Sequence, residues 1–324
     1  MELANLSGKI FLGEWTFNVI ELSDIDLYSD YIRQTEYTPN LWTSNFPLLW
    51  AISQSRIKKI LWKIIDDMLV TFGYLKSGFL YLICLPVGKG DPEAVSKVVY
   101  KALNFCNKWN VNLESNTLVK VVNSTQLDFL RKYDKFNEYF KVVGWVGLEK
   151  HFSIDKLVSL PGKEFESIRR KINKFHRLYP TAKLREYENT DFNKVMDLGK
   201  QWSNTAGEKY SVIFDNVYFY EIIKNYSALN HLVLVVEMED KIIGMVSGGA
   251  LPTGQSWWCL SKFMNDYNGL SEVLIIELAK VINKRNPSIE FMNAGEDLGP
   301  GGLRIFKQRF KPVMDLRRYA IYLR

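Results

Sequence analysis

The spacing of hydrophobic residues changes along the chain, and these changes predict its helices and strands. Residues 78–86 form an apolar run bounded by turn residues, which is typical of a buried strand. From Pro92 to Trp109 apolar residues recur every three or four positions, so this segment is expected to form an amphipathic helix. The first half of the chain is therefore predicted to be a mixed α/β domain.

The second half alternates between the two periods more clearly. Apolar residues at 165, 168, 172, 175 and 179 predict a helix, which Pro180 is expected to end. The later pattern predicts a helix at 193–202, strands at 232–237, 242–250 and 255–262, a helix at 271–283, a strand at 289–292, a helix at 303–310 and a strand at 318–323. This order is expected of an acyltransferase fold of the N-acetyltransferase (GNAT) type. A topology alone does not establish a function.

The chain length of 324 residues favours two domains over a single hydrophobic core. The best boundary lies near residues 148–160, where an aromatic run gives way to charged residues and a Pro-Gly pair. We therefore predict an N-terminal domain at 1–150 and a C-terminal domain at 151–324. Each is expected to be an α/β domain of the GNAT-like type, with a mixed sheet flanked by helices.

Composition excludes several protein classes. Hydrophobic residues make up 47% and charged residues 24% of the chain, which is globular rather than disordered. The three cysteines are far apart in the sequence, and no histidine lies at metal-ligand spacing from them, so we expect neither disulfides nor a metal site. The N-terminus does not resemble a signal peptide, and no window is long and apolar enough to span a membrane. We expect a cytoplasmic protein, including one attached peripherally to the inner membrane surface.

Positive charge gathers in two segments. Residues 304–324 contain seven basic side chains, Lys311 among them, against the single acid Asp315, and the whole chain has a net charge of +6. A second cluster includes Arg169, Arg170 and Lys174 on the predicted helix at 165–179. Such clusters indicate an anionic partner, such as tRNA or a lipid headgroup, although each alone is equally typical of a solvated surface.

The densest group of chemically active residues lies between positions 293 and 307. Two carboxylates, Glu296 and Asp297, follow a predicted strand, and the cations Arg304 and Lys307 lie on one face of the next predicted helix. The intervening loop contains three glycines, which let the backbone approach a ligand closely: Gly299, Gly301 and Gly302. The segment can thus offer an acid or base beside fixed positive charge. The alternative is a capped helix with a tight turn.

A second candidate region is the turn after the predicted strand at 255–262. Lys262 ends this strand, and Asn268 and Gly269 precede the next helix. In a CoA-dependent GNAT enzyme this turn carries a Gln/Arg-x-x-Gly-x-Gly/Ala loop that holds the pyrophosphate, and here only Gly269 is present. The sequence therefore weakens the prediction of a CoA donor. For Lys262 the alternative is a surface lysine whose ammonium extends into water.

The chain resembles the C-terminal catalytic domain of the phosphatidylglycerol lysyltransferase family, in the form of its stand-alone members. The motif from Glu296 to Lys307, with Pro312 after it, carries most of this resemblance. Weaker matches cover nearly the whole chain: residues 36–42, 160–163 and 169–175, the region of Trp202, and Ser261 with Lys262. We expect no multi-span membrane module of the kind found in the lipid-modifying members, and Asn-Ala-Gly stands before Glu296 where those members tend to have an Asn-Arg-Glu-like run.

The resemblance implies tandem GNAT-like folds and transfer of an amino acid from aminoacyl-tRNA. It maps Asp297, Arg304 and Lys307 onto positions that matter for transfer. An aminoacyl ester is already activated, so its transfer to an amine or hydroxyl needs positioning, proton transfer and oxyanion stabilisation but no further cofactor. The acceptor is expected to be a lipid headgroup or a small molecule. Two other functions stay open, a CoA-dependent N-acyltransferase and a non-catalytic module that binds tRNA or phospholipid.

Overall fold

The computed structural model describes residues 7–113, 116–205, 216–298 and 301–324. The chain forms two compact units, residues 1–149 with 316–324, and residues 150–315. The C-terminal residues 316–324 therefore group with the first unit, whereas the sequence analysis placed them in the second domain. Two long strands, β7 (Phe140–Ser153) and β13 (Met314–Leu323), each contain residues of both units.

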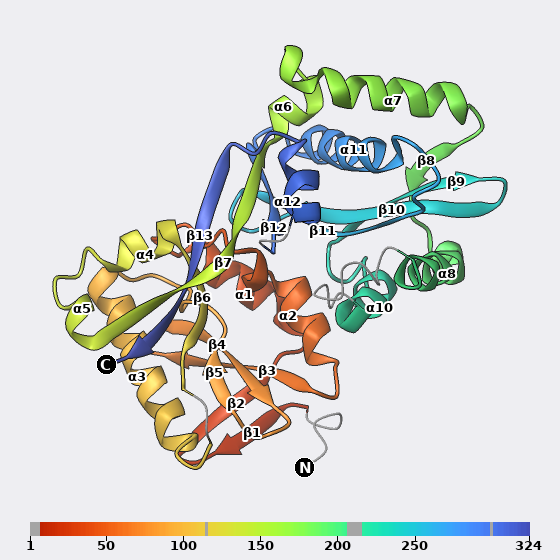
Figure 1. The fold of residues 1–324 in the computed structure, drawn as a ribbon. Coiled ribbons are helices and arrows are strands. Elements are labelled where there is room, and N and C mark those ends of the chain that lie inside the picture. The colour runs from red at the N-terminus through yellow and green to blue at the C-terminus, as the bar shows by residue number, and fades with distance from the viewer. Residues whose placement is uncertain (1–6, 114–115, 206–215, 299–300) are drawn as a thin grey trace. The chain divides into compact units, whose positions relative to one another are not determined.

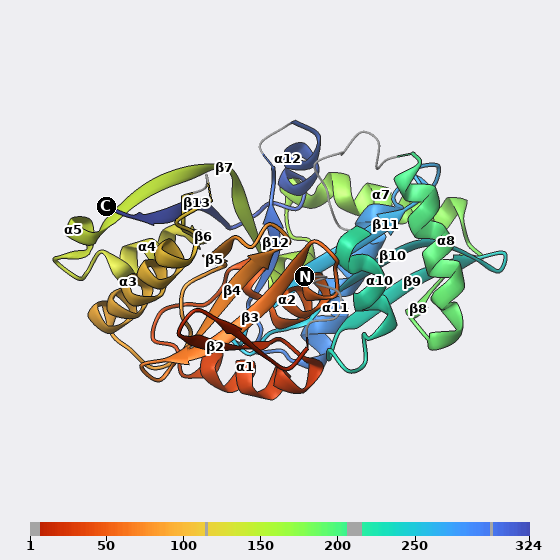
Figure 2. The same ribbon diagram turned by 90° about the horizontal axis from the view of Figure 1, so that it is seen from below.

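Unit 1 contains a mixed sheet in the order β1-β2-β3-β4-β5-β6-β13-β7. Its other strands are β1 (Lys9–Leu12), β2 (Trp15–Val19), β3 (Lys58–Ile65), β4 (Met68–Leu75), β5 (Leu80–Leu82) and β6 (Val119–Asn123). Its helices are α1 (Ile25–Arg33), α2 (Phe46–Ser53), α3 (Pro92–Trp109), α4 (Ser124–Leu130) and α5 (Phe136–Tyr139). Figures 1 and 2 both show β13 running beside β7 in this unit.

The amphipathic helix expected from Pro92 to Trp109 is confirmed as α3. Asp91 caps its N-terminus by accepting a hydrogen bond from the backbone of Ala94, and its apolar face packs on the sheet, where Phe105 stacks on Trp15 at 3.9 Å between ring centroids. The strand predicted at 78–86 is wrong in extent, because only β5 is regular. Beyond it, Ile83 donates to the carbonyl of Thr71, and the Pro86 that follows has no N–H for a ladder.

Unit 2 contains the strand order β12-β11-β10-β9-β8. These strands are β8 (Lys183–Glu186), β9 (Leu232–Met238), β10 (Lys241–Ala250), β11 (Ser256–Phe263) and β12 (Phe291–Glu296). The helices are α6 (Ile154–Ser159), α7 (Glu166–Leu178), α8 (Phe192–Ser203), α10 (Asn216–Lys224), α11 (Leu270–Arg285) and α12 (Gly301–Gln308). All the elements predicted for residues 165–323 are confirmed, with ends that differ by a few residues.

Helices cover both faces of the unit 2 sheet. Figure 1 shows α11, with α7 outside it, on one face and α8 and α10 on the other. The α11 face is apolar, with Val246, Leu274 and Trp258 among its buried residues. It supplies most of the hydrophobic stabilisation of this unit.

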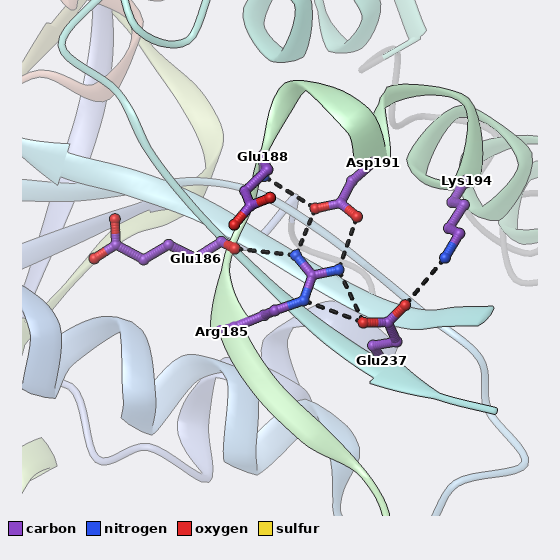
Figure 3. Close-up of polar contacts among 6 residues, drawn as sticks. All are labelled: Arg185, Glu186, Glu188, Asp191, Lys194 and Glu237. Atoms are coloured by element: carbon purple, nitrogen blue, oxygen red, sulfur yellow. Dashed lines mark hydrogen bonds and ion pairs between the residues drawn. The ribbon is translucent and has the colours of Figure 1, made fainter. Parts of the chain in front are cut away.

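A network of charged residues connects the edge strand β8 to α8 (Figure 3). Arg185 donates to both carboxylate oxygens of Asp191, at 2.6 and 2.8 Å, and to Glu237 at 2.9 Å. Lys194 donates to the other oxygen of Glu237. These ion pairs and hydrogen bonds lower the pKa of Asp191 and of Glu237 and raise the pKa of Arg185. The network fixes the start of α8, the helix that carries Trp202.

Candidate active site

The centre of the candidate site in unit 2 is Asp297, which directly follows β12. Its side chain is 1% exposed. Its Oδ2 lies 3.4 Å from Nζ of Lys150 and 3.6 Å from Nε of Arg304. Lys150 is itself fully buried on β7 and also pairs with Asp315 at 2.7 Å. A buried carboxylate is retained where cations compensate its charge, and Lys150 and Arg304 supply that compensation here.

Unusual backbone conformations place Asp297 at this point. Gly295 has a φ of +70°, and its N–H donates to Oδ1 of Asn293 at 2.7 Å. Leu298, on the other side of Asp297, has a φ of +55°, which is uncommon for a residue with a side chain. Such conformations cluster at functional sites, where the surrounding structure holds them.

Arg304 and Lys307 have different environments, although both lie on α12. Lys307 is buried, and its Nζ donates to the carbonyl oxygens of Ala294 and Glu296 at 2.7 and 2.5 Å. It therefore ties α12 to the end of β12. The side chain of Arg304 is 53% exposed, so its guanidinium is accessible to an anion. Of these two cations, Arg304 is thus the accessible one and Lys307 the buried one.

The glycines of the motif have no visible ligand role. Gly301 and Gly302 are exposed and begin α12, and Gly299 lies outside the described residues. A helix start of this kind presents backbone N–H groups that favour an anion, but α12 is a short helix and its exposed glycines add no side chain.

Lys262 is fully buried, so the alternative of a surface lysine is wrong. It pairs across the sheet with Met245 and therefore faces α8 and α10. Its Nζ lies 3.4 Å from the centroid of the Trp202 ring and 5.6 Å from that of Phe219. The attraction between an ammonium and an aromatic face strengthens when both are removed from water. Lys262 thus supplies a positive charge at the end of β11, opposite the apolar side of the sheet.

The turn before α11 is closely packed and carries a buried acidic side chain in the helix that follows. Gly269 has a φ of +93°, and a Cβ there would collide with the carbonyl of Lys171 in α7. The first turn of α11 contains the buried Glu272, which accepts a hydrogen bond from Ser271 and pairs with the ammonium of Lys171. A carboxylate at this helix start already uses the favourable positive end of the helix and would repel a diphosphate. Asn268, the other predicted residue of this turn, is exposed.

The basic helix is α7, and part of its charge is accessible. Arg170 and Lys174 are exposed, whereas Arg169 donates to the carbonyl of Leu160 and is partly buried. Lys311 is also exposed, with a φ of +55°. The predicted C-terminal basic segment is divided between the units, because residues 316–324 belong to unit 1. It cannot be treated as one charged tail.

The sequence analysis missed two charged residues of this region. It noted Lys150 only as part of the domain boundary, although this lysine contacts Asp297. It gave no role to Glu272, which lies in the first turn of α11 and forms an ion pair with Lys171. Both are ordinary charges in sequence, and only the packing of distant elements gives them partners.

Comparison with known proteins identifies the family. Residues 43–322 match the family model described as "Phosphatidylglycerol lysyltransferase, C-terminal". The chain belongs to this family. Comparison with curated proteins gave no match.

Solved structures show the same fold. A conserved protein of unknown function from Bacteroides thetaiotaomicron has a TM-score of 0.80 and 21% identity, with 95% of this chain and 99% of that chain covered. L-PGS from Bacillus licheniformis has a TM-score of 0.64 and 14% identity, covering 92% and 91%. FemX has a TM-score of 0.61 and 9% identity, covering 94% and 96%. The predicted fold class, tandem GNAT-like domains, is thereby confirmed.

The described residues contain neither a group of metal ligands nor a membrane-spanning helix. Among the residues that the structure describes, no three His, Cys, Asp or Glu side chains group as metal ligands. Within the same described ranges, no helix has the length and apolar character needed to cross a bilayer.

Proposed function

We propose that this protein is an aminoacyltransferase that moves an amino acid from aminoacyl-tRNA to an amine or hydroxyl acceptor. The observation that carries the proposal is the buried Asp297, held between Lys150 and Arg304 directly after β12. Membership of a family named for a lysyltransferase supports the same reaction class. The family name also supports a lipid headgroup as acceptor, and a small-molecule acceptor is compatible with the same site.

The chemistry assigns separate roles to these residues. Asp297 accepts a hydrogen bond from the acceptor and orients its hydroxyl or amine towards the ester carbonyl. It can also act as the base that takes the acceptor's proton. The accessible Arg304 contacts a phosphate or the developing oxyanion. Lys150 and Lys307 hold this arrangement in place, because their ammonium groups already contact protein oxygens.

The donor is tRNA rather than CoA in this proposal. The start of α11 is occupied by Glu272 and closed over by α7, so it does not fit a pyrophosphate. An aminoacyl ester needs no such loop, because the tRNA backbone can be bound by exposed cations such as Arg170 and Lys174. A cytoplasmic or membrane-peripheral location would give the protein access to charged tRNA.

The experiment is an assay with two donors. The purified protein is incubated with a charged tRNA pool carrying labelled amino acids, with and without phosphatidylglycerol vesicles or a bacterial cell extract. We expect loss of the aminoacyl ester that depends on protein and acceptor together, with no consumption of acetyl-CoA in a parallel reaction. Acetyl-CoA consumption without tRNA deacylation would instead establish a CoA-dependent acyltransferase.

A further inference from the structure

Two lysines on the sheet of unit 1 converge on one tyrosine. Lys58 begins β3, Lys120 lies on β6, and Tyr81 lies on β5. The lysine Nζ atoms are 5.7 and 5.9 Å from the centroid of the Tyr81 ring. Among the described residues, no acidic side chain lies within ion-pair distance of either lysine. The two charges are therefore brought together without a protein counter-ion.

The tyrosine between them is held firmly. Tyr81 is 4% exposed and pairs across the sheet with Gly73, where an added Cβ would collide with the ring. The ring therefore lies against the backbone of β4 in space that only glycine leaves open. Phe79 stacks against it, at 5.7 Å between centroids with an interplanar angle of 23°. The ring is therefore a fixed aromatic surface that both ammonium groups approach.

Lys58 is half-buried and the side chain of Lys120 is exposed, and the surrounding protein lowers the pKa of both ammonium groups. Burial lowers the pKa of Lys58 to about 8. Burial also lowers the pKa of Lys120, and the charges of Lys58 and Arg318 lower it further, with Tyr81 opposing them. The buried Lys150 of unit 2, by contrast, is compensated by two carboxylates. An anion between Lys58 and Lys120 would supply the compensation that the protein itself does not.

We propose that unit 1 binds the phosphate group of a small phosphorylated molecule between Lys58 and Lys120, above the Tyr81 ring. Lysine is a compact cation suited to phosphate oxygens, and two lysines match the two negative charges of a phosphate monoester or diphosphate. The exposed Trp145, whose Nε1 donates to the carbonyl of Lys120, gives the remainder of the ligand an apolar surface beside the phosphate. This site lies in unit 1 and does not depend on the proposed transfer reaction in unit 2.

The test is isothermal titration of the full chain with pyrophosphate and with inorganic phosphate as probes. We expect pyrophosphate to bind, and its affinity to fall by about tenfold or more in Lys58→Gln and in Lys120→Gln. Lys58→Arg should restore most of the affinity, because it keeps the charge. Lys63→Gln is the matched control, since Lys63 lies on β3 but points to the opposite face and contacts Trp15. Its affinity should equal that of the unaltered protein.

Three results would overturn the proposal. They are absence of pyrophosphate binding at about ten millimolar, equal affinities in all four variants, or acetate binding as tightly as pyrophosphate, which would indicate a carboxylate site. If a variant does not fold, the pKa of Lys58 in the unaltered protein provides the test instead. Pyrophosphate should raise the pKa of Lys58, read from the pH dependence of its acylation, and an unchanged pKa would contradict the site.

Discussion

The two faces of the unit 2 sheet are built on different physical principles. The α11 face is a continuous apolar core in which Leu274 and Val246 are fully buried. The α8 face also buries apolar residues such as Val235 and Met245, but it contains in addition the fully buried Lys262, packed on Trp202, and the buried hydroxyl of Ser247. Burying a charged group lowers the free energy of unfolding, whereas burying a leucine side chain raises it. A protein that needed only stability would have no reason to place a lysine there.

The difference indicates a division of labour. The α11 face contributes to the stability of unit 2. On the α8 face, the buried Lys262 beside the rings of Trp202 and Phe219 lowers that stability. Asp297 at the end of β12 is likewise a buried charged group, and its carboxylate lies beside two cations, Lys150 and Arg304. Substitutions on the first face should therefore change the free energy of unfolding, and substitutions on the second should change activity.

The largest stability effect is expected on the α11 face. Leu274 is fully buried and packs over Gly244 of β10. Leu274→Ala should reduce the free energy of unfolding by about 2 to 5 kcal/mol, through lost burial and the cavity that remains. Urea unfolding measures the loss. The transfer rate per folded molecule should not change, and a large fall in that rate would contradict the division between the faces.

The reverse pattern is expected for Lys262. Lys262→Met keeps the volume and removes the charge, so the melting temperature should hold or rise. The transfer rate should fall by about tenfold to a hundredfold, because Lys262 is expected to contribute its charge to the binding of the substrate rather than to the stability of the fold. Met245→Leu, on the neighbouring strand of the same face, is the control and should keep its rate. A destabilised but fully active Lys262→Met would show that the lysine is structural.

The network that anchors α8 should have a pH-dependent contribution. The pKa values of Asp191 and Glu237 are lowered in the folded state, so their stabilisation is present at neutral pH and is lost as the pH falls through those folded values. Arg185→Met should therefore cost about 1 to 2 kcal/mol at pH 7, and much less near pH 3. Urea unfolding at the two pH values measures the difference.

A neighbouring arginine provides the control for this prediction. Arg285 pairs with Glu186 of β8, but both side chains are more than half exposed. Arg285→Met should have little effect at either pH, because exposed pairs contribute little. Equal effects of the two substitutions would mean that the arrangement of Arg185 in Figure 3 adds nothing beyond surface charge.

The smallest effect is expected on α7, outside the α11 face. Reversing Arg170 and Lys174 to Glu should weaken tRNA binding by about tenfold at moderate salt, and should flatten the dependence of affinity on salt concentration. Reversing Lys97 and Lys101 of α3 changes the net charge equally at the same spacing and serves as the control. Identical losses in both proteins would remove α7 from the proposed tRNA interface.

Residue patterns predicted the fold more completely than the site. Periodicity gave α3 and most elements after residue 165, because amphipathic helices and buried strands have clear spacing, but it missed the short edge strand β8 and the helix α10. It overextended the strand around β5, where the chain leaves the ladder near Pro86. It also grouped Arg304 with Lys307 as neighbours on a helix, although only the packing of α12 on β12 shows that Lys307 is buried. Partners such as Lys150 for Asp297 lie too far apart in sequence for any local pattern to reveal.

The central claim is that Asp297 takes part in transfer rather than only closing a loop with Arg304. The direct measurement is the single-turnover transfer rate of Asp297→Asn, together with its tRNA affinity and melting temperature. Asp315→Asn, which alters the other carboxylate on Lys150, is the matched control. We expect Asp297→Asn to lose about two to four orders of magnitude in rate while tRNA affinity holds, and the control to lose less than about tenfold. A destabilised Asp297→Asn whose folded fraction transfers at the full rate would contradict the claim.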